Sequence, residues 1–523
     1  MYKINQVTLP IDFSKDNLKT YLAKKIKCDE SNITYAKLNK LSIDARDKSD
    51  IVYKASIIFD TKSQFNVKKY KNVEICDGAT YNVDKWKTHR SVLIVGSGPS
   101  GLFAGLRLAE SGAKVTIIER GYEMAKRKVA VDKMMREGIL DTTSNIQFGE
   151  GGAGTFSDGK LNTGIKSPHI STVLETFHKF GADECITYDA RPHIGTDVLS
   201  KVIVRMREYM KSLGVQFLFE HKLVGLEFNN NKLRGGIVLS GDETKIIESD
   251  YIVLAIGHSS RDTVRMLYDT DIKFKQKPFS MGFRIEHLQK DINMAQYGNS
   301  EASKLLPPAD YHIVEHVGDR VVYSFCMCPG GVVVPASSEE GAVVTNGMSY
   351  NSRDGVNSNS ALLVNVNTTD FPDSHPLAGI SLQEKYERFA YSKTGSYSAV
   401  VQRVGDFLLG RPTTRLGKVK PTYTPNVVLG SVEDMLPEYI IKSIRQALPS
   451  IGKRLKGFDD PDAIFTGVET RSSAPYQMER GMDMQTSIED VFAIGEGAGF
   501  AGGIVSSAVE GLKCADILIS KNN

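Results

Sequence analysis

The sequence predicts an α/β protein built from three parts, and three observations predict it. A short segment with mixed strand and helix patterns comes first. A strand, a glycine-rich turn and a helix begin abruptly near residue 91, and a second strand with a glycine cluster follows only near residue 495. The long stretch between the two glycine clusters therefore reads as an inserted domain. The 523 residues are 41% hydrophobic and 24% charged, an ordinary composition for a globular chain with several cores.

Residues 1–88 read as a small α+β module. "INQVTLPI" favours a strand, "DNLKTYLAKKIKC" a helix that begins beside an aspartate, and "ITYAKL" and "DIVYKASIIF" two more strands. Residues 1–90 carry 18 Lys and Arg against 11 Asp and Glu, a balance of +7, whereas the whole chain has a net charge of only +3. Such a module either meets an acidic partner, nucleic acid included, or presents solvated lysines, and we favour the second.

A dinucleotide-binding unit begins at "SVLIVGSGPSGLFAGLRLAESGAKVTIIERG". A β-branched strand precedes Gly96, Gly98 and Gly101, which form G-x-G-x-x-G, a helix follows, and the next strand ends at Glu119. The glycines allow a tight turn, close approach to a pyrophosphate and close helix–strand packing, and the acid is spaced to bind ribose hydroxyls. This Rossmann-type unit predicts a set of dinucleotide contacts: Gly96, Gly98, Pro99, Ser100, Gly101, Glu119, Arg120 and Arg127.

Two distant segments favour FAD over NAD as the dinucleotide. "SDYIVLAIGHSS" is an apolar strand that breaks at a glycine, and "VFAIGEGAGFAGGIVSSA" is a late strand, an acid, a glycine cluster and a helix start. Here the sequence resembles the glutathione-reductase-like class of FAD enzymes, in which the late acid binds the ribityl–pyrophosphate part and the helix N-terminus stabilises reduced flavin. The resemblance implies that Leu223 contacts the adenine of FAD. It also implies further FAD contacts, the last of them with the flavin, at Ala255, Gly257, Gly495, Glu496, Gly502, Gly503 and Ile504.

The resemblance extends along nearly the whole chain. The segments "SNIQFGEGGAGTFSDGKL", "RPHIGTD", "SFCMCPGGVVVPASS", "TNGMS" and "VETRSSAP" are similar to those of a bacterial family of uncharacterised FAD-dependent dehydrogenases. This family implies a fold and FAD as the cofactor, and it implies no particular substrate.

The glycine-rich segment "NIQFGEGGAGTFSDGKLNTG" has two readings. "GTFSDGK" matches most of a P-loop, but Leu161 stands where a P-loop needs a hydroxyl for Mg²⁺, and no strong strand precedes it. In the FAD enzymes that the chain resembles, such a segment runs beside the pyrophosphate and the isoalloxazine, where glycines let the backbone approach. We therefore expect FAD contacts from Gly151, Gly152, Gly154 and Thr155. Lys160 is either a group that favours the anionic reduced flavin or a surface lysine.

These patterns divide the chain into domains. Residues 1–88 are the N-terminal module, 89–265 and 462–523 the Rossmann-type FAD-binding domain, and 266–461 an inserted α+β substrate or cap domain. The inserted part contains no second strand–G-x-G-x-x-G–helix unit. A resident NAD(P)H domain is therefore not expected, and an NAD(P)H donor would bind only transiently.

Two cysteines are candidates for chemistry in the inserted domain. Cys326 and Cys328 in "FCMCPGG" would face one side of a strand, because they stand two residues apart. A redox pair, a metal site and ordinary buried thiols are the alternatives, and we favour the last, with the segment walling the pocket. We nevertheless name Cys328 as a candidate catalytic residue.

Two more motifs offer polar side chains. In "RPHIGTD", His193 beside Arg191 could anchor an anionic substrate or protonate a product. The alternative, which we slightly favour, is a histidine in a turn whose hydrogen bonds are all made within the protein. In "ETRSSAP", Glu469 and Arg471 are expected to form a buried pair that ties the inserted domain to the FAD-binding domain. No cluster with metal-ligand spacing is apparent, so no metal is expected.

The sequence favours an FAD-dependent oxidoreductase that passes hydride through flavin N5 between a transient reductant and a small-molecule substrate. The alternatives are an RNA-modifying flavoprotein that uses the basic module and a non-catalytic flavin-binding or redox-sensing protein. The six cysteines do not form a disulfide framework, the opening residues show no signal sequence, and no apolar run is long enough for a membrane span. We therefore expect a cytoplasmic protein without a membrane partner.

Overall fold

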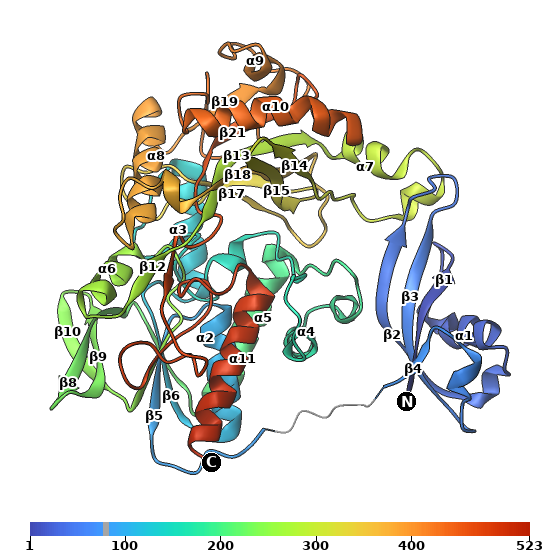
Figure 1. The fold of residues 1–523 in the computed structure, drawn as a ribbon, viewed down its shortest axis with the longest axis horizontal. Helices are drawn as coiled ribbons and strands as arrows, with labels where there is room; N and C mark the ends of the chain where they lie inside the picture. Colours follow the sequence, from blue (N-terminus) through green and yellow to red (C-terminus); the bar gives the residue numbers. More distant parts are fainter. Residues whose placement is uncertain (77–82) are drawn as a thin grey trace.

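The computed structural model describes residues 1–76 and 83–523, which form a three-part α/β molecule (Figure 1). The N-terminal module is an antiparallel sheet packed against one helix, α1 (Leu18–Ile26). Its strands, in spatial order, are β2 (Ile33–Asp44), β3 (Val52–Thr61), β1 (Tyr2–Leu9) and β4 (Val73–Ile75).

Strand β2 makes one of the contacts between the module and the rest of the chain; Lys15 with Glu184 and Lys48 with the Ala295 carbonyl make others. The Leu41 amide donates to the Tyr188 carbonyl at 2.7 Å, and the Ala190 amide donates to the Leu41 carbonyl at 2.8 Å. Residues 83–88 belong with the main body. Trp86 lies in the hydrophobic core of that body, and its backbone N–H donates to the Ser111 carbonyl at 2.9 Å. The module therefore ends before residue 88, where we expected its boundary.

A parallel five-stranded sheet forms the Rossmann-type domain. Its strands, in spatial order, are β23 (Val491–Ala493), β11 (Tyr251–Leu254), β5 (Ser91–Val95), β6 (Lys114–Glu119) and β7 (Gln216–Phe219). Val92 and Ile94 face one hydrophobic cluster and Leu93 and Val95 the other, because side chains alternate along a strand. Both faces of the sheet are buried, which explains the continuous apolar runs in its strands.

Helices cover one face of this sheet and a small antiparallel sheet covers the other. The helices are α2 (Pro99–Ser111), α5 (Gly195–Ser212) and α11 (Ile504–Lys521), and the small sheet is β8 (Lys222–Asn229), β9 (Lys232–Ser240) and β10 (Glu243–Glu248). Helices α2 and α11 lie side by side (Figure 1) because Gly511 has no side chain: a Cβ there would lie 2.2 Å from the Ser100 carbonyl oxygen.

A seven-stranded sheet forms the inserted domain. Its strands, in spatial order, are β14 (Val314–Val317), β15 (Arg320–Cys328), β18 (Asn357–Val366), β13 (Phe279–Leu288), β21 (Ile464–Glu469), β19 (Ala399–Arg403) and β20 (Val427–Leu429). Helices α8 (Ala378–Thr394) and α10 (Glu438–Arg454) pack against it, and the whole unit lies over the Rossmann-type domain (Figure 1).

The inserted sheet continues past residue 461, where we expected the insertion to end. Strand β21 lies between β13 and β19, so this sheet extends to Glu469. An apolar strand does not reveal from its sequence which sheet it joins. The pair β12 (Phe274–Gln276) and β22 (Tyr476–Met478) lies where the chain enters and leaves the insertion.

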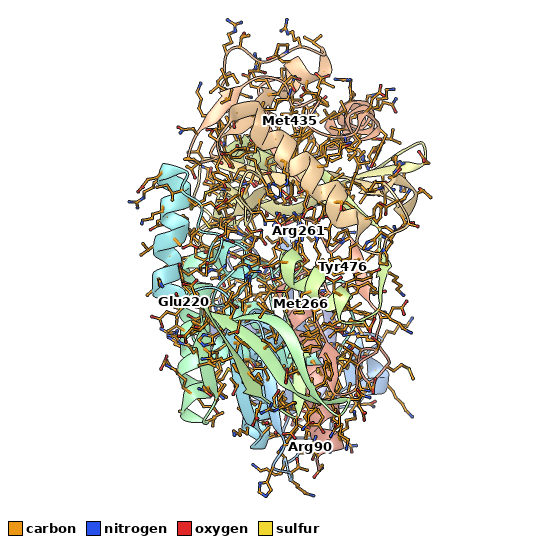
Figure 2. All side chains as sticks on the ribbon, turned by 90° about the vertical axis from the view of Figure 1, so that its left-hand side faces the viewer. Arg90, Glu220, Arg261, Met266, Met435 and Tyr476 are labelled. Carbon is orange, nitrogen blue, oxygen red and sulfur yellow. The ribbon has the colours of Figure 1, made fainter. Side chains whose placement is uncertain are left out.

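In the side view of Figure 2, Arg261 lies between Met435 of the inserted domain and Arg90 at the start of β5.

Among residues 1–76 and 83–523, no helix combines the length and apolar character needed to cross a membrane. The remaining longer elements are α3 (Met124–Glu137), α4 (His169–Lys179), α6 (Arg261–Asp269), α7 (Gln289–Tyr297), α9 (Val404–Leu408), β16 (Val332–Pro335) and β17 (Thr345–Met348).

Candidate functional site

A cavity of about 700 Å³ lies where the Rossmann-type domain meets the inserted domain. Residues at or just after the C-terminal ends of β5, β6, β11 and β23 line one side, and residues of β15, β17 and β21 line the other. The C-terminal edge of the strands is where open α/β sheets bind ligands, and the volume is in the range of small-molecule pockets.

Most residues predicted to contact FAD line this cavity. They are Gly96, Gly98, Pro99, Ser100, Glu119, Arg120, Gly152, Gly154, Leu223, Ala255, Gly257, Glu496, Gly502, Gly503 and Ile504. The predicted contacts that do not line it are Gly101, Arg127, Gly151, Thr155 and Gly495.

The glycines outside the cavity lining serve close packing behind its wall. A Cβ on Gly101 would lie 2.0 Å from the Gly96 carbonyl oxygen, and a Cβ on Gly495 would lie 2.6 Å from Ser100 Oγ. A Cβ on Gly151 would lie 2.2 Å from the Oγ1 of Thr155, which is fully buried. These residues shape the wall and do not form its surface.

The cavity wall has room and charge for a ligand such as FAD. A Cβ added to Gly257, Gly502 or Gly503 would meet no protein atom within 4 Å and would enter the cavity instead. Helices α2 and α11 both begin at this wall, where Pro99 and Ile504 line the cavity. The positive ends of two helix dipoles therefore face one space, which suits a pyrophosphate and an electron-rich flavin.

The glycine-rich segment after α3 crosses the start of α2. A Cβ on Gly152 would lie 3.0 Å from the Gly98 Cα, so the two backbones approach as closely as glycine permits. The segment contains only a short 3-10 turn, Ala153–Phe156, and no helix follows Lys160 directly. The P-loop interpretation therefore has no structural basis here, because a P-loop lysine opens a helix.

Glu119 organises the wall through its carboxylate. One oxygen accepts hydrogen bonds from the Ser97 amide at 3.0 Å and hydroxyl at 2.8 Å, and the other accepts from the amides of Gly121 at 2.9 Å and Gly149 at 3.1 Å. Its contact with the FAD ribose stays a prediction.

The structure corrects our expectation for Arg127. Its guanidinium is completely buried and donates to the backbone carbonyls of Asn145, Ile146, Gly149 and Glu150 at 2.6–3.2 Å, so it holds the loop and does not reach the cavity. Burial lowers the pKa of Arg127 to about 10.

Arg120, in contrast, does line the cavity. Its guanidinium binds Asp262 at 2.7 Å and lies 4.0 Å from the centre of the Phe148 ring. The strand pattern placed both arginines near the cofactor, and only the tertiary contacts distinguish their roles.

Lys160 is the predicted catalytic residue that lines the cavity. Its Nζ is buried, has no hydrogen-bond partner among the described residues and lies 3.5 Å from an oxygen of Asp158. His193 is paired with Lys160 in an isolated β-bridge but does not line the cavity, and its Nε2 lies 3.2 Å from the Asn351 carbonyl oxygen. Burial lowers the pKa of His193, and its role in binding a substrate or protonating a product stays a prediction.

Cys326, and not the predicted Cys328, stands in the cavity wall. Cys328 is 0% exposed and lies behind it. We expected both thiols on one face of a regular strand, but a β-bulge between Phe325 and Cys328 breaks that alternation. Arg191 also lines the cavity and is ion-paired with Asp310.

Glu469 and Arg471 do not pair with each other, contrary to our expectation. Glu469 lines the cavity and binds the buried Arg284 at 3.1 Å. Burial raises the pKa of Glu469 to about 7, against the opposing charge of Arg284. Arg471 instead binds Glu387 of α8 at 2.7 Å.

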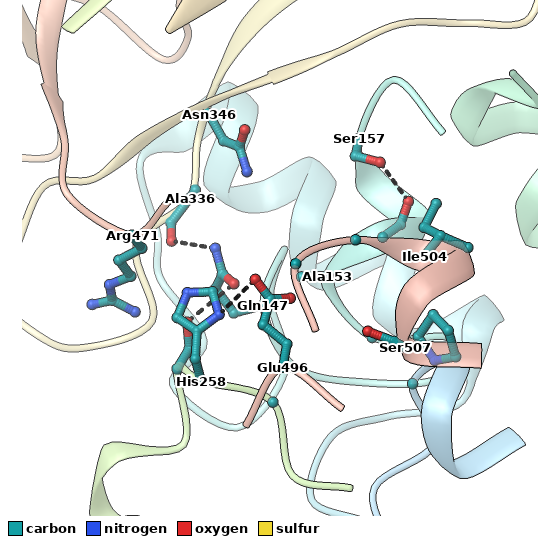
Figure 3. Close-up of a pocket in the computed structure, with 18 of the residues that line it drawn as sticks. Gln147, Ala153, Ser157, His258, Ala336, Asn346, Arg471, Glu496, Ile504 and Ser507 are labelled. Carbon is teal, nitrogen blue, oxygen red and sulfur yellow. Dashed lines mark hydrogen bonds and ion pairs between the residues drawn. The ribbon is translucent and has the colours of Figure 1, made fainter. Parts of the chain in front are cut away.

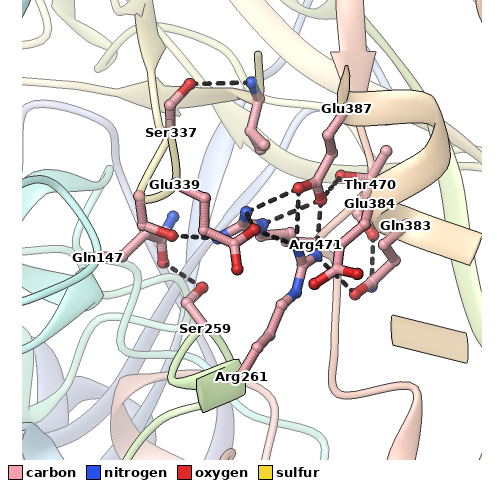
Figure 4. Close-up of polar contacts among 12 residues, drawn as sticks. Gln147, Ser259, Arg261, Ser337, Glu339, Gln383, Glu384, Glu387, Thr470 and Arg471 are labelled. Carbon is pink, nitrogen blue, oxygen red and sulfur yellow. Dashed lines mark hydrogen bonds and ion pairs between the residues drawn. The ribbon is translucent and has the colours of Figure 1, made fainter. Parts of the chain in front are cut away.

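A buried network joins the two domains beside the cavity (Figure 4). Glu387 accepts hydrogen bonds from Arg261 of the Rossmann-type domain and from Arg471, both at 2.7 Å, and Glu339 binds Arg261 as well. The tie between the domains that we expected therefore exists, but with different partners. No local sequence pattern announces Arg261 or Glu387, because each becomes buried only when the domains meet.

Further polar residues line the wall, of which Gln147 and Asn346 were not predicted as site residues. His258 Nδ1 lies 3.3 Å from Glu496, and the two side chains face each other at the cavity (Figure 3). Gln147 accepts from Ser259 at 3.1 Å and donates to the Ala336 carbonyl at 3.3 Å. Asn346 lines the cavity from β17.

Comparisons with known proteins identify the cofactor. Residues 89–144 match the model of an FAD binding domain, residues 278–472 match a family described as "FAD-dependent protein, C-terminal domain-like", and residues 1–59 match a domain of unknown function. An uncharacterized protein of Clostridium beijerinckii is 42% identical over 529 residues, covering 99% of this chain and 98% of that protein. FAD is therefore the cofactor, and the wall described above fits it.

Solved structures are similar only at a distance. The flavin-dependent brominase Bmp2 is 12% identical with a TM-score of 0.39, over 83% of this chain and 80% of that one. A flavoprotein/dehydrogenase from Cytophaga hutchinsonii is 11% identical with a TM-score of 0.38, over 83% and 78%.

Proposed function

Because the chain belongs to the family of FAD-dependent proteins that includes its Clostridium beijerinckii relative, we propose that it is an oxidoreductase of the glutathione-reductase-like class. In this proposal a transient reductant and a small-molecule substrate exchange hydride by way of flavin N5. The observation that carries the proposal is one shared cavity, lined by the glycine motifs on one side and by polar side chains of the inserted sheet on the other.

Each side of the cavity has a role in this proposal. When bound, FAD would supply the two-electron chemistry. The first turn of α11, beginning at Ile504, and Glu496 with its partner His258 would orient the cofactor. Residues of the inserted sheet would face the substrate, and Lys160 would present a positive charge that favours a negative group on the flavin or on the substrate.

The test is anaerobic reduction of the bound flavin by NADH, NADPH and a panel of metabolites. We expect at least one donor to bleach the visible absorption of the flavin. Lys160→Met should slow this reduction, whereas Lys166→Met, which changes an exposed lysine nearby, should not. A flavin that dithionite reduces but no biological donor reduces would favour a flavin-binding or sensing protein instead.

A further inference from the structure

One carboxylate oxygen in the cavity wall has no partner in the protein. Glu469, the last residue of β21, is 4% exposed and lines the cavity, and one of its oxygens accepts from Arg284 Nη1 at 3.1 Å. The other oxygen has no hydrogen-bond donor among the described residues and is not one of their fully enclosed polar atoms, so it faces the cavity. A buried acceptor without a donor is costly. The free oxygen therefore points to a ligand that brings a donor.

Arg284 holds Glu469 in this position from behind the wall. Arg284 is 0% exposed, and it also donates Nε to the Asn359 side chain at 3.1 Å and Nη2 to the Cys326 carbonyl at 3.0 Å. Because three separate acceptors fix the guanidinium, the free oxygen of Glu469 keeps one direction. The arginine also balances the charge of the carboxylate, so the pair suits a neutral donor better than an ammonium group.

Two aromatic side chains face the same cavity from β15. Val322 packs in the core of the inserted domain, and because side chains alternate along a strand, Tyr323 and Phe325 face the opposite way, where both line the cavity. Their ring centres lie 6.5 Å apart, with the ring planes at 85°. Within residues 1–76 and 83–523, neither ring belongs to a hydrophobic core cluster. The two rings therefore offer an apolar surface to an aromatic ring of a ligand.

We propose that Glu469, Tyr323 and Phe325 bind an aromatic alcohol, with Arg284 as the positioning residue of Glu469. The substrate ring packs against the two aromatic side chains, and the substrate hydroxyl donates to the free oxygen of Glu469. The glycine motifs expected to contact FAD line the opposite wall, which leaves this wall to the substrate. This inference rests on the proposed oxidoreductase function and names the substrate class of its cavity.

In the reaction, the alcohol loses its hydroxyl proton and one hydrogen of the carbinol carbon. The O–H bond breaks, its proton binds the free oxygen of Glu469, and the electron pair of that bond forms the C=O π bond. The C–H bond breaks as its hydrogen leaves with the electron pair, as hydride, for flavin N5. The alcohol is thereby oxidised to an aldehyde or ketone. Burial raises the pKa of Glu469 to about 7, which helps the carboxyl group to keep the proton.

The main test measures binding to the FAD-loaded, oxidised, full-length protein without a reductant. Phenol has the ring and the hydroxyl but no carbinol hydrogen, so it binds without reacting, whereas in anisole a methyl ether replaces the hydroxyl. Each compound is titrated while the visible absorption of the flavin and the heat of binding are recorded. We expect phenol to bind about tenfold more tightly than anisole, because anisole leaves the Glu469 oxygen without a donor.

Variants separate the two parts of the site. In Glu469→Gln the amide oxygen stays with Arg284 and the NH₂ group faces the cavity, so phenol should lose its advantage over anisole. Phe325→Leu should weaken the binding of both compounds equally, because they share the ring. Glu340→Gln changes an exposed carboxylate that does not line this cavity and should alter neither affinity.

Anaerobic mixing with benzyl alcohol tests the proton transfer. We expect benzyl alcohol to bleach the flavin of the wild-type protein, and Glu469→Gln to slow this reduction by about 100-fold or more, as expected for loss of a general base. Equal rates in the two proteins would overturn the role of Glu469 as the proton acceptor, and so would a flavin that NADH reduces but benzyl alcohol does not.

The wild-type protein decides the main point even if a variant does not fold. Equal affinities for phenol and anisole, or tighter binding of benzylamine than of phenol, would overturn the hydroxyl site. A lower FAD affinity in Glu469→Gln with an unchanged ratio of phenol to anisole binding would assign the free oxygen to the flavin instead. Selective binding of phenol beside a flavin that no donor reduces would refute only the proposed hydride transfer. Equal affinities beside a flavin that another donor reduces would refute only this site.

Discussion

The two sides of the cavity are built by different means. The cofactor side is lined by Gly96, Gly98, Gly257, Gly502 and Gly503, and at the last three of these a Cβ would meet no protein atom within 4 Å. The inserted side, lined from β15, β17 and β21, consists of side chains that are held by other buried side chains. A backbone wall can be read from glycine spacing, whereas a side-chain wall depends on partners far away in the chain.

This difference has a consequence for tolerance to mutation. On the cofactor side, an atom added at Gly257, Gly502 or Gly503 would meet no protein atom, so we expect the loss to appear in cofactor binding. On the inserted side, loss of one polar partner leaves another buried and uncompensated, so the loss should appear in folding stability. The following substitutions test this contrast.

Glu387→Gln should have the largest effect. It leaves the buried guanidinium groups of Arg261 and Arg471 without their shared carboxylate and should lower the free energy of unfolding by about 3–5 kcal/mol. Denaturant unfolding measures this loss. Glu384→Gln, which removes an ion pair with the exposed Arg265, is the control and should cost about 1 kcal/mol or less. Similar losses in both variants would contradict the importance of the buried network.

Glu119→Ala should weaken FAD binding by about 1–3 kcal/mol, because the amides of Ser97, Gly121 and Gly149 lose their charged acceptor. Glu119→Gln keeps the size of the side chain and should retain part of the affinity. Titration of the apoprotein with FAD gives the three dissociation constants. An unchanged affinity in Glu119→Ala would mean that these hydrogen bonds do not shape the cofactor side.

Gly257→Ala and Gly410→Ala form a matched pair. Both glycines have φ near 70°, and a Cβ on either meets no protein atom within 4 Å, but only Gly257 lines the cavity. Each substitution should cost about 1–2 kcal/mol in folding stability. Only Gly257→Ala should also lower FAD affinity, by about tenfold, equivalent to about 1.4 kcal/mol. Equal FAD affinities would show that the space beside Gly257 is not used by the cofactor.

Removal of residues 1–82 should have the smallest effect on the flavin. The module contacts the main body through Leu41, which bonds to Tyr188 and Ala190. Lys15 also pairs with Glu184 and Lys48 with the Ala295 carbonyl, and none of these residues lines the cavity. The absorption spectrum of bound FAD should therefore stay unchanged. A soluble but colourless protein would show that the module completes the site, and a changed substrate affinity alone would point to the neighbouring Arg191, which does line the cavity.

Most of the cofactor side could be predicted from the sequence. The spacing of Gly96, Gly98 and Glu119, together with the late Glu496 and Gly503, predicts a strand–turn–helix order whose geometry is local, because each turn is made by adjacent residues. The same reasoning placed Arg120 and Arg127 together, although only the first lines the cavity. A charge near a motif does not show whether carbonyl groups from elsewhere, such as those of Asn145 and Ile146, will occupy it.

The inserted side could not be predicted in the same way, because its contacts join residues that are distant in sequence. Regular alternation along a strand predicts that Cys326 and Cys328 share a face, but a bulge in the pairing with β18 leaves Cys326 in the cavity wall and Cys328 buried behind it. Likewise, Glu469 and Arg471 are neighbours in sequence, yet each finds a partner from another element, Arg284 and Glu387. The physical reason is that desolvated charges pair with whichever opposite charge folding brings within reach, and that choice is absent from the local sequence.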